Sequence, residues 1–173
     1  MHHAPVIEIS SSHFRNKDLL FKAIIAAKCR EHATAGGLLA LADQDPRQAL
    51  TLIRTRFTGL MTSPDVLALN RVVATESVKN PKMAELLYET GPEPTLRQFA
   101  ELLRAWVARG LMEVRHPERA ADHFFSMLRG MLQFRMTMNL EKNPSEERIR
   151  RHVEDCVEMF MRAYGPHSAT SAT

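Results

Sequence analysis

The chain has 173 residues, enough for one domain with a single hydrophobic core, and its 45% hydrophobic and 25% charged residues are ordinary for a soluble globular protein. Its net charge of +3 is spread along the chain, which permits a nucleic-acid partner without requiring one. The two cysteines, Cys29 and Cys156, exclude a C-x-x-C site and fit reduced thiols in the cytoplasm, which is the location we predict. No apolar run is long enough to span a membrane, and we predict neither a membrane segment nor a signal peptide.

A first long helix is predicted over residues 17–42, with Asn16 as its N-cap. Inside it, Gly36 and Gly37 predict a kink or a break, because each glycine destabilises a helix by about 1 kcal/mol relative to alanine. Residues 1–12 show no clear period and are predicted as frayed helix or coil.

Later helices are marked by a capping residue followed by proline, as at Asp45 and Ser63. Residues 91–94 are predicted as a loop, and Thr95 with Gln98 as the capping box that follows it. No segment alternates like a strand, so we predict an all-α fold. The predicted helices span residues 47–62, 64–79, 82–88, 95–109, 117–139 and, after a cap at Asn143, a last helix that ends before Gly165.

Sequence motifs of enzymes are absent: the chain has no G-x-S-x-G, P-loop, G-x-G-x-x-G or H-E-x-x-H. His152 and Cys156 share a helix face, but two ligands do not make a closed metal site. A small buried cysteine beside a surface histidine is the simpler interpretation. We therefore predict a protein that is not an enzyme and that needs no metal or cofactor.

The predicted helix 117–139 is apolar on more than one face and must be covered on all sides. A central position in the bundle would be enough. Alternatively, one face packs inward and another packs on a second copy. We favour the second interpretation because the last helix is also amphipathic, and two helices from each copy would form a two-fold interface. The predicted homodimer interface comprises Phe124, Leu128, Leu132, Ile149, Val153, Val157 and Phe160.

Residues 13–25 read His-Phe-Arg-Asn-Lys-Asp-Leu-Leu-Phe-Lys-Ala-Ile-Ile. This segment closely resembles the one that joins the DNA-binding head to the ligand-binding body in the TetR/AcrR family of transcriptional regulators. Further similarities, to the AefR-like C-terminal domain of that family, follow in the same order along the chain. They lie at residues 45–50, 71–76, 80–84, 88–92, 117–124 and 160–165.

The resemblance implies a TetR-like ligand-binding and dimerisation bundle, part of a homodimeric, ligand-responsive regulator that is usually a repressor. It assigns residues 17–166 to this domain, residues 1–16 to a remnant of the helix-turn-helix head, and residues 167–173 to a disordered tail. His13 and Lys17 fit positions from which the family contacts DNA phosphates. Operator DNA is therefore an expected partner only where a complete head is present. The alternative is a headless ligand-binding and dimerisation module without specific DNA binding.

The family binds effectors between the helices of the body, and a small apolar or amphipathic effector is the expected partner here. Asn70 and Arg71 are either the solvated side of the helix 64–79 or polar groups directed into an apolar pocket. Judged from helix faces alone, the predicted pocket residues are Phe57, Met61, Asn70, Arg71, Trp106, Phe125, Met127 and Met131.

Overall fold

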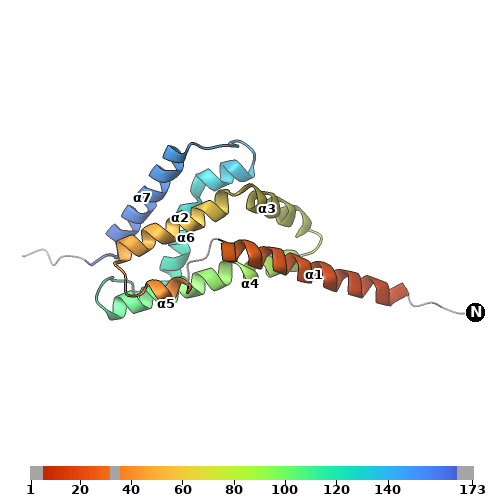
Figure 1. The fold of residues 1–173 in the computed structure, drawn as a ribbon, viewed down its shortest axis with the longest axis horizontal. Helices are drawn as coiled ribbons and strands as arrows, with labels where there is room; N and C mark the ends of the chain where they lie inside the picture. The colour runs from red at the N-terminus through yellow and green to blue at the C-terminus, as the bar shows by residue number, and fades with distance from the viewer. Residues whose placement is uncertain (1–5, 32–35, 167–173) are drawn as a thin grey trace, which may run out of the picture.

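The computed structural model describes residues 6–31 and 36–166, with side chains from residue 19 onward, and each regular element in these ranges is a helix. The helices in chain order are α1 (Val6–Glu31), the 3-10 helix η1 (Leu38–Leu41), α2 (Pro46–Thr62), α3 (Pro64–Glu76), α4 (Lys82–Thr90), α5 (Pro92–Ala108), α6 (Pro117–Thr137) and α7 (Glu146–Tyr164). The predicted all-α fold is therefore confirmed. α1 packs along α4 and projects well beyond the other helices (Figure 1). Within the described ranges, no helix is long and apolar enough to cross a membrane.

Two predicted helix starts are confirmed by hydrogen bonds at their caps. The side chains of Asp45 and Ser63 accept hydrogen bonds from the backbone N–H three residues on, at 3.1 and 3.3 Å. A proline follows each cap at the first helical position, where its missing N–H costs no helical bond. α7 also begins at a capping side chain, without a proline after it, but the cap is Ser145, which accepts from Arg148 N at 3.2 Å, rather than the predicted Asn143.

The N-terminal helix differs from the prediction at both ends. α1 begins at Val6, so Asn16 lies inside the helix and does not cap it, and α1 ends at Glu31. No glycine or proline occurs between these ends, and the serines near the start lower helix propensity by only about half a kcal/mol each. Gly36 and Gly37 adopt φ values of 76° and 78°, which are incompatible with a continuing helix, and the predicted break there is confirmed.

Several predictions concern parts of the chain that the structure does not describe. The tail at residues 167–173 lies outside the described residues. His13 and Lys17 lie within α1, but their side chains are outside the described part as well. The backbone of α1 continues without interruption past residue 16, where the sequence predicts a domain boundary.

α5 begins at Pro92, three residues earlier than predicted. Thr95 does not cap this helix, because its hydroxyl donates to the carbonyl oxygen of Gly91 at 2.9 Å. Gln98, the expected partner in the capping box, instead accepts a hydrogen bond from Leu38 N at 3.4 Å and so links α5 to η1. Residues 91–94 are therefore not a loop: their prolines fall in the first turn of a helix, where proline is tolerated.

The main hydrophobic core lies between α2, α5, α6 and α7. Phe99, Phe124 and Phe160 come from α5, α6 and α7, are fully buried, and have ring centroids 4.9 to 6.1 Å apart. Trp106 is fully buried in the same core. Burial of each such side chain stabilises the fold by about 1.5–3 kcal/mol, so this cluster holds the three helices in fixed positions.

α6 bends at Gly130, whose φ of 46° and ψ of −163° lie outside the helical region. The ring of His152 on α7 lies in the bend, and its Nε2 is 3.1 Å from the carbonyl oxygen of Leu128. The sequence does not predict this bend, because an isolated glycine is also tolerated in a straight helix.

Candidate ligand-binding site

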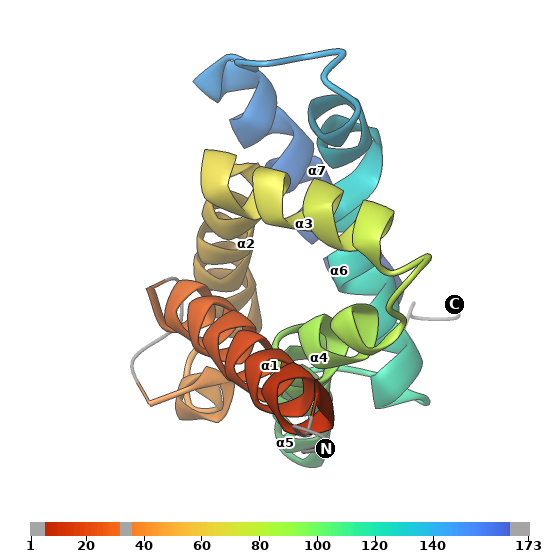
Figure 2. The ribbon, with the colours of Figure 1, turned by 90° about the vertical axis from the view of Figure 1, so that its right-hand side faces the viewer.

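A cavity of about 720 Å³ lies among the helices, within the range of pockets that bind small molecules. Its lining comes from α1, α2, α3, α4, α5 and α6. Figure 2 looks along the molecule and shows α1, α2, α3, α4 and α6 arranged around this region. Helices from both halves of the chain therefore enclose a single site.

Most of the cavity wall is apolar. On one side, Phe57 of α2 and Phe125 of α6 contact each other, with ring centroids 4.7 Å apart and planes tilted by 57°. Such a wall favours a ligand with an apolar, ring-sized body, because its burial removes apolar surface from water. The other apolar lining residues include Ile25, Ile53, Leu60, Met61, Val66, Leu69, Leu87 and Leu96.

α6 contributes one continuous run of polar residues to the wall, beside polar residues from other helices. Asp122, Ser126, Arg129 and Gln133 follow one another at helical spacing, so they form one stripe, and all four line the cavity. Gln133 is engaged within the protein, since its Nε2 donates to the sulfur of Met61 at 3.3 Å. The stripe thus places several polar groups side by side in a largely apolar wall, as ligand sites commonly do.

Arg129, a residue of this stripe, has its guanidinium beside an aromatic ring. Its guanidinium carbon lies 5.9 Å from the ring centroid of Phe57, within range of a cation–π interaction. Burial lowers the pKa of the guanidinium, and the nearby charge of Asp122 acts in the opposite direction. Among the described residues, none forms a hydrogen bond or an ion pair with Arg129.

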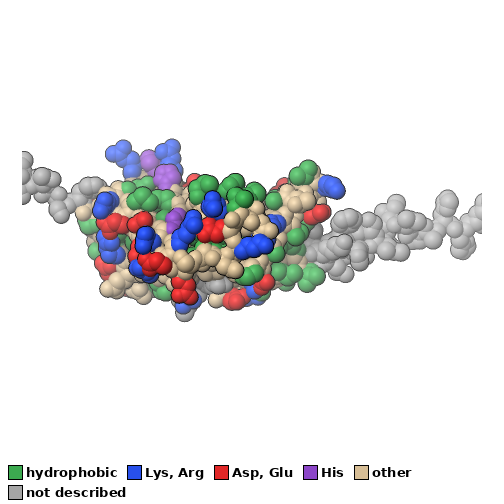
Figure 3. Space-filling view, turned by 90° about the horizontal axis from the view of Figure 1, so that it is seen from above, with side chains coloured by type: hydrophobic (Ala, Val, Ile, Leu, Met, Phe, Trp, Pro, Cys, Tyr) green, Lys and Arg blue, Asp and Glu red, His purple; other side chains and the backbone are tan. Residues whose placement is uncertain are grey.

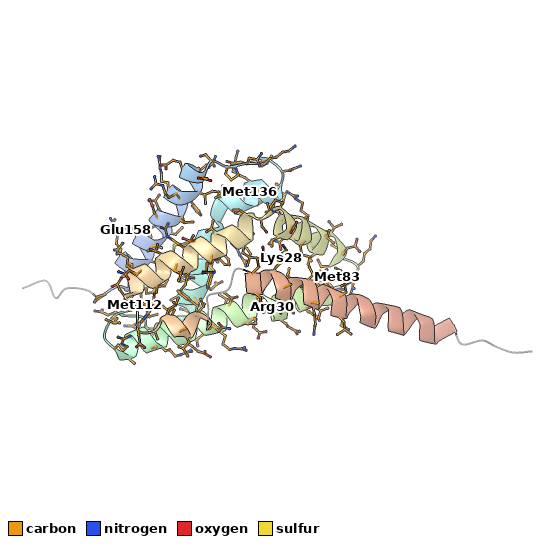
Figure 4. All side chains as sticks on the ribbon, viewed as in Figure 1. Lys28, Arg30, Met83, Met112, Met136 and Glu158 are labelled. Atoms are coloured by element: carbon orange, nitrogen blue, oxygen red, sulfur yellow. The ribbon has the colours of Figure 1, made fainter. Side chains whose placement is uncertain are left out.

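α1 closes the cavity on another side, through Ile25, Ala26 and Cys29. Lys28 points from α1 toward α3 (Figure 4), where its Nζ lies 2.8 Å from Asp65, and it is also 3.2 Å from Glu31. These hydrogen bonds, with Asp65 first, raise the pKa of Lys28. Desolvation raises the pKa of the Cys29 thiol, which is therefore protonated at neutral pH.

The predicted pocket residues divide into two groups. Phe57, Met61, Asn70 and Phe125 line the cavity. Of the other four, Trp106 is 0% exposed in the core and Met131 is 66% exposed on the outside of α6. Met127 lines a separate outer groove with Met159 and Tyr164. Arg71 points away from the cavity and donates to the carbonyl oxygens of Met136 and Thr137, both at 2.7 Å, so it supports the end of α6.

Sequence reasoning missed the contributions of α1 and α4 and the polar stripe of α6. The spacing of Asp122, Ser126, Arg129 and Gln133 was a usable signal, because polar residues that recur at i, i+4, i+7 and i+11 share one face of a helix. The walls supplied by α1 and α4 carry no such signal, since their cavity residues are ordinary apolar positions.

The residues predicted for the dimer interface require a correction. Phe124, Leu128, Leu132, Val153, Val157 and Phe160 are buried inside the single chain, and Ile149 packs partly buried against Leu132. They belong to the inner faces of α6 and α7. Periodicity identified two apolar faces on α6 but does not show which of them faces inward. A different set is exposed, which we call the outer stripe: Met131 and Phe134 of α6, Met138 directly after α6, and Met159 of α7.

Charged side chains on the surface of α7 are largely paired with each other. Arg150 pairs with Glu147 and Glu154, Arg151 pairs with Glu147, and Arg162 pairs with Glu158. In the space-filling view, basic and acidic side chains are interspersed over the visible face (Figure 3). That face therefore has no large patch of one sign of charge of the kind that binds nucleic acid. Over the described part of the chain, no group of three or more His, Cys, Asp or Glu residues could hold a metal ion.

The structure is an all-helical body around a cavity, with a long N-terminal helix that forms one wall and projects outward. Residues 48–166 match the family described as "AefR-like transcriptional repressor, C-terminal domain". The match covers most of the chain, and the chain belongs to this family of TetR-type regulators. The sequence has no significant match among curated proteins.

Three solved structures share the fold. A TetR-family regulator from Mesorhizobium loti MAFF303099 has a TM-score of 0.76 at 22% identity, covering 91% of this chain and 80% of that one. The flavonoid-responsive regulator FrrA has a TM-score of 0.69 at 28% identity, covering 91% and 79%. A TetR-family regulator from Pseudomonas syringae pv. tomato str. DC3000 has a TM-score of 0.66 at 18% identity, covering 91% and 78%.

Proposed function

We propose that this protein is a cytoplasmic repressor whose affinity for DNA is changed by a small, largely apolar effector bound in the cavity. The observation that carries the proposal is the position of α1. Its residues Ile25, Ala26 and Cys29 form a cavity wall, while its N-terminal half projects away from the body (Figure 1). An effector that fills the cavity therefore presses on the base of the helix whose other end leads away from the body.

The mechanism requires two arrangements of α1 and an effector that binds one of them more tightly. The ion pair of Lys28 with Asp65 connects α1 to α3 across the cavity rim. Because both groups are partly exposed, this pair is weak and is easily exchanged for another arrangement. A shift at this end of α1 is amplified along a rigid helix into a larger displacement at its far end.

A homodimer would double the DNA contact and give the two heads a separation that α1 can change. The outer stripe is the surface on this chain that suits such a dimer. Met131, Phe134 and Met159 are exposed apolar side chains on adjacent α6 and α7. Two copies related by a two-fold axis would bury the stripe in a four-helix interface.

We propose that His13 and Lys17, on the projecting half of α1, contact DNA phosphates. Residues 1–16 then belong to the DNA-binding side and residues 17–166 to the effector-binding and dimerisation unit. The alternative, a module that binds effector and dimerises without reading DNA, shares the cavity and the dimer but lacks sequence-specific binding.

A binding titration distinguishes these two functions. Fluorescence anisotropy would compare the full chain on the DNA that flanks its own gene and on a shuffled duplex of equal length, at 150 mM salt. We expect a preference of about 1,000-fold or more for the flanking DNA if the chain is a regulator. Equal affinity for both duplexes, falling steeply with salt, would support the headless module instead.

A further inference from the structure

Of the cations in the wall of the cavity, Arg129 is the one that lies over an aromatic ring and forms no ion pair with any described residue. Lys28 is paired with Asp65 and Glu31. Arg129, by contrast, forms no hydrogen bond or ion pair within the described chain, and its guanidinium lies over the ring of Phe57. A guanidinium has five N–H donors, and those of Arg129 are open to acceptors from a ligand or from water.

The surroundings of Arg129 define what could satisfy it. Phe57 and Phe125 lie in contact on the adjoining wall, so an apolar ring placed there comes within reach of the guanidinium. Asp122 and Ser126 share the α6 stripe and can accept hydrogen bonds from hydroxyl groups of a ligand. The charge of Asp122 would repel a second anion beside it.

We propose that the effector is an amphipathic aromatic monoanion, whose oxyanion is bound by Arg129 while its ring packs against Phe57 and Phe125. This inference rests on the proposed function, since it names the chemical class of the effector that fills the same cavity. A carboxylate or a sulfonate matches the fork of donors on a guanidinium and can accept two parallel hydrogen bonds. The apolar walls formed by α1, α2 and α4 would enclose the remainder of the molecule.

Two fluorescent probes that share one ring system and differ in a sulfonate group measure how much the anionic group contributes to binding. 1-Anilinonaphthalene-8-sulfonate carries a sulfonate, and N-phenyl-1-naphthylamine is the same aromatic body without it. Each would be titrated into the wild-type chain and into Arg129→Gln and Arg129→Lys. Arg119→Gln, an exposed position on the same helix, is the matched control for charge. Ala26→Phe reduces the cavity from the α1 side and reports whether the probes bind inside it.

We expect Arg129→Gln to weaken binding of the sulfonate probe by about 10- to 100-fold, the range for hydrogen bonds to a charged group. Arg129→Lys would recover part of this loss, because it keeps the charge but not the fork of donors. The neutral probe should change by less than about 3-fold in either variant, which also shows that the cavity has kept its shape. Arg119→Gln should leave both probes unchanged, and Ala26→Phe should weaken both.

Three results would overturn the inference. The first is equal loss for the two probes in Arg129→Gln, since the residue would then act on packing alone. The second is a sulfonate-specific loss in Arg30→Gln, at the cavity edge on α1, and none in Arg129→Gln. The third is unchanged binding of the sulfonate in Ala26→Phe, which would put the probe outside the cavity. If the wild-type chain binds only the neutral probe, the proposal of an anionic effector is refuted, but the proposed function with an apolar effector stands. If the wild-type chain binds neither probe, the proposed function of the cavity as an effector site is refuted.

Discussion

The imidazole of His152 on α7 occupies the space that any side chain at Gly130 on α6 would need. A Cβ at Gly130 would stand 2.9 Å from Cε1 of His152, closer than such atoms approach in proteins. The same glycine has a φ of 46°, which L-residues rarely adopt. The bend that it permits separates Arg129, which lines the cavity, from Met131, which lies on the outer stripe.

Gly130→Ala should destabilise the protein through two effects, positive φ and the clash with His152. We expect a loss of about 2–4 kcal/mol in the free energy of unfolding, or roughly 5–15 °C in Tm for a chain of this length. Gly110→Ala is the matched control, because Gly110 has a φ of 70° but no atom within 4 Å of the added Cβ. Thermal unfolding followed by circular dichroism measures both, and an equal loss in the two variants would show that the His152 contact contributes nothing.

Phe134→Glu should dissociate the proposed dimer without unfolding the chain. Phe134 is 48% exposed on the outer stripe, so a carboxylate there is solvated in the monomer but would be buried in the interface. Light scattering at micromolar concentration should report a mass near the single-chain value of 19.6 kDa for the variant and twice that for the wild type.

Two further variants give the dimer measurement its controls. Val72→Glu changes an exposed valine on α3, away from the outer stripe, and should leave the dimer intact. Val157→Glu places a carboxylate in the core between α6 and α7 and should unfold the chain rather than separate two folded ones. A wild-type mass equal to that of one chain would contradict the dimer proposal.

The parts of the fold that the sequence predicts are those with local causes. Asp45 and Ser63 begin helices because their side chains bond to nearby N–H groups, and this interaction is contained within four residues. The extension of α1 back to Val6 was missed because its period is weak, and the early start of α5 because Pro92 and Pro94 suggest a loop as readily as a first helical turn.

The site was less predictable because it depends on tertiary contacts. Phe57 and Phe125 line the cavity, whereas Trp106 lies in the core, and an apolar position cannot reveal whether it faces a cavity or a packed core. The sequence predicts Arg71 as a pocket residue, yet its partners are carbonyls 65 and 66 residues further along the chain. Such pairings follow from the packing of α3 on α6 and leave no local pattern.

Arg71→Met should lower stability and leave ligand binding unchanged. The side chain donates to the carbonyl oxygens of Met136 and Thr137 at the end of α6, and loss of these two bonds should cost about 1–2 kcal/mol. Chemical denaturation measures this loss, and titration with N-phenyl-1-naphthylamine measures the cavity. A fall in probe affinity with unchanged stability would reinstate Arg71 as a pocket residue.

The buried thiol of Cys156 should make the protein less stable in alkaline solution. Burial raises the pKa of Cys156 from its ordinary value of 9.0 to about 11. Between these values the unfolded chain has lost the proton that the folded chain keeps, so the free energy of unfolding falls as pH rises, by up to about 1.4 kcal/mol per pH unit. Denaturation of wild type and Cys156→Ala across pH 8–11 isolates this contribution as their difference, and a difference independent of pH would contradict it.

The proposed regulation depends on binding of the effector in the cavity between α1 and α6. Hydrogen–deuterium exchange with and without 1-anilinonaphthalene-8-sulfonate tests it most directly. We predict slower exchange in residues 19–31 of α1 and in the segment of α6 around Arg129, because both line the cavity. Protection confined to the outer groove of Met127, Met159 and Tyr164, with none in α1, would contradict the account.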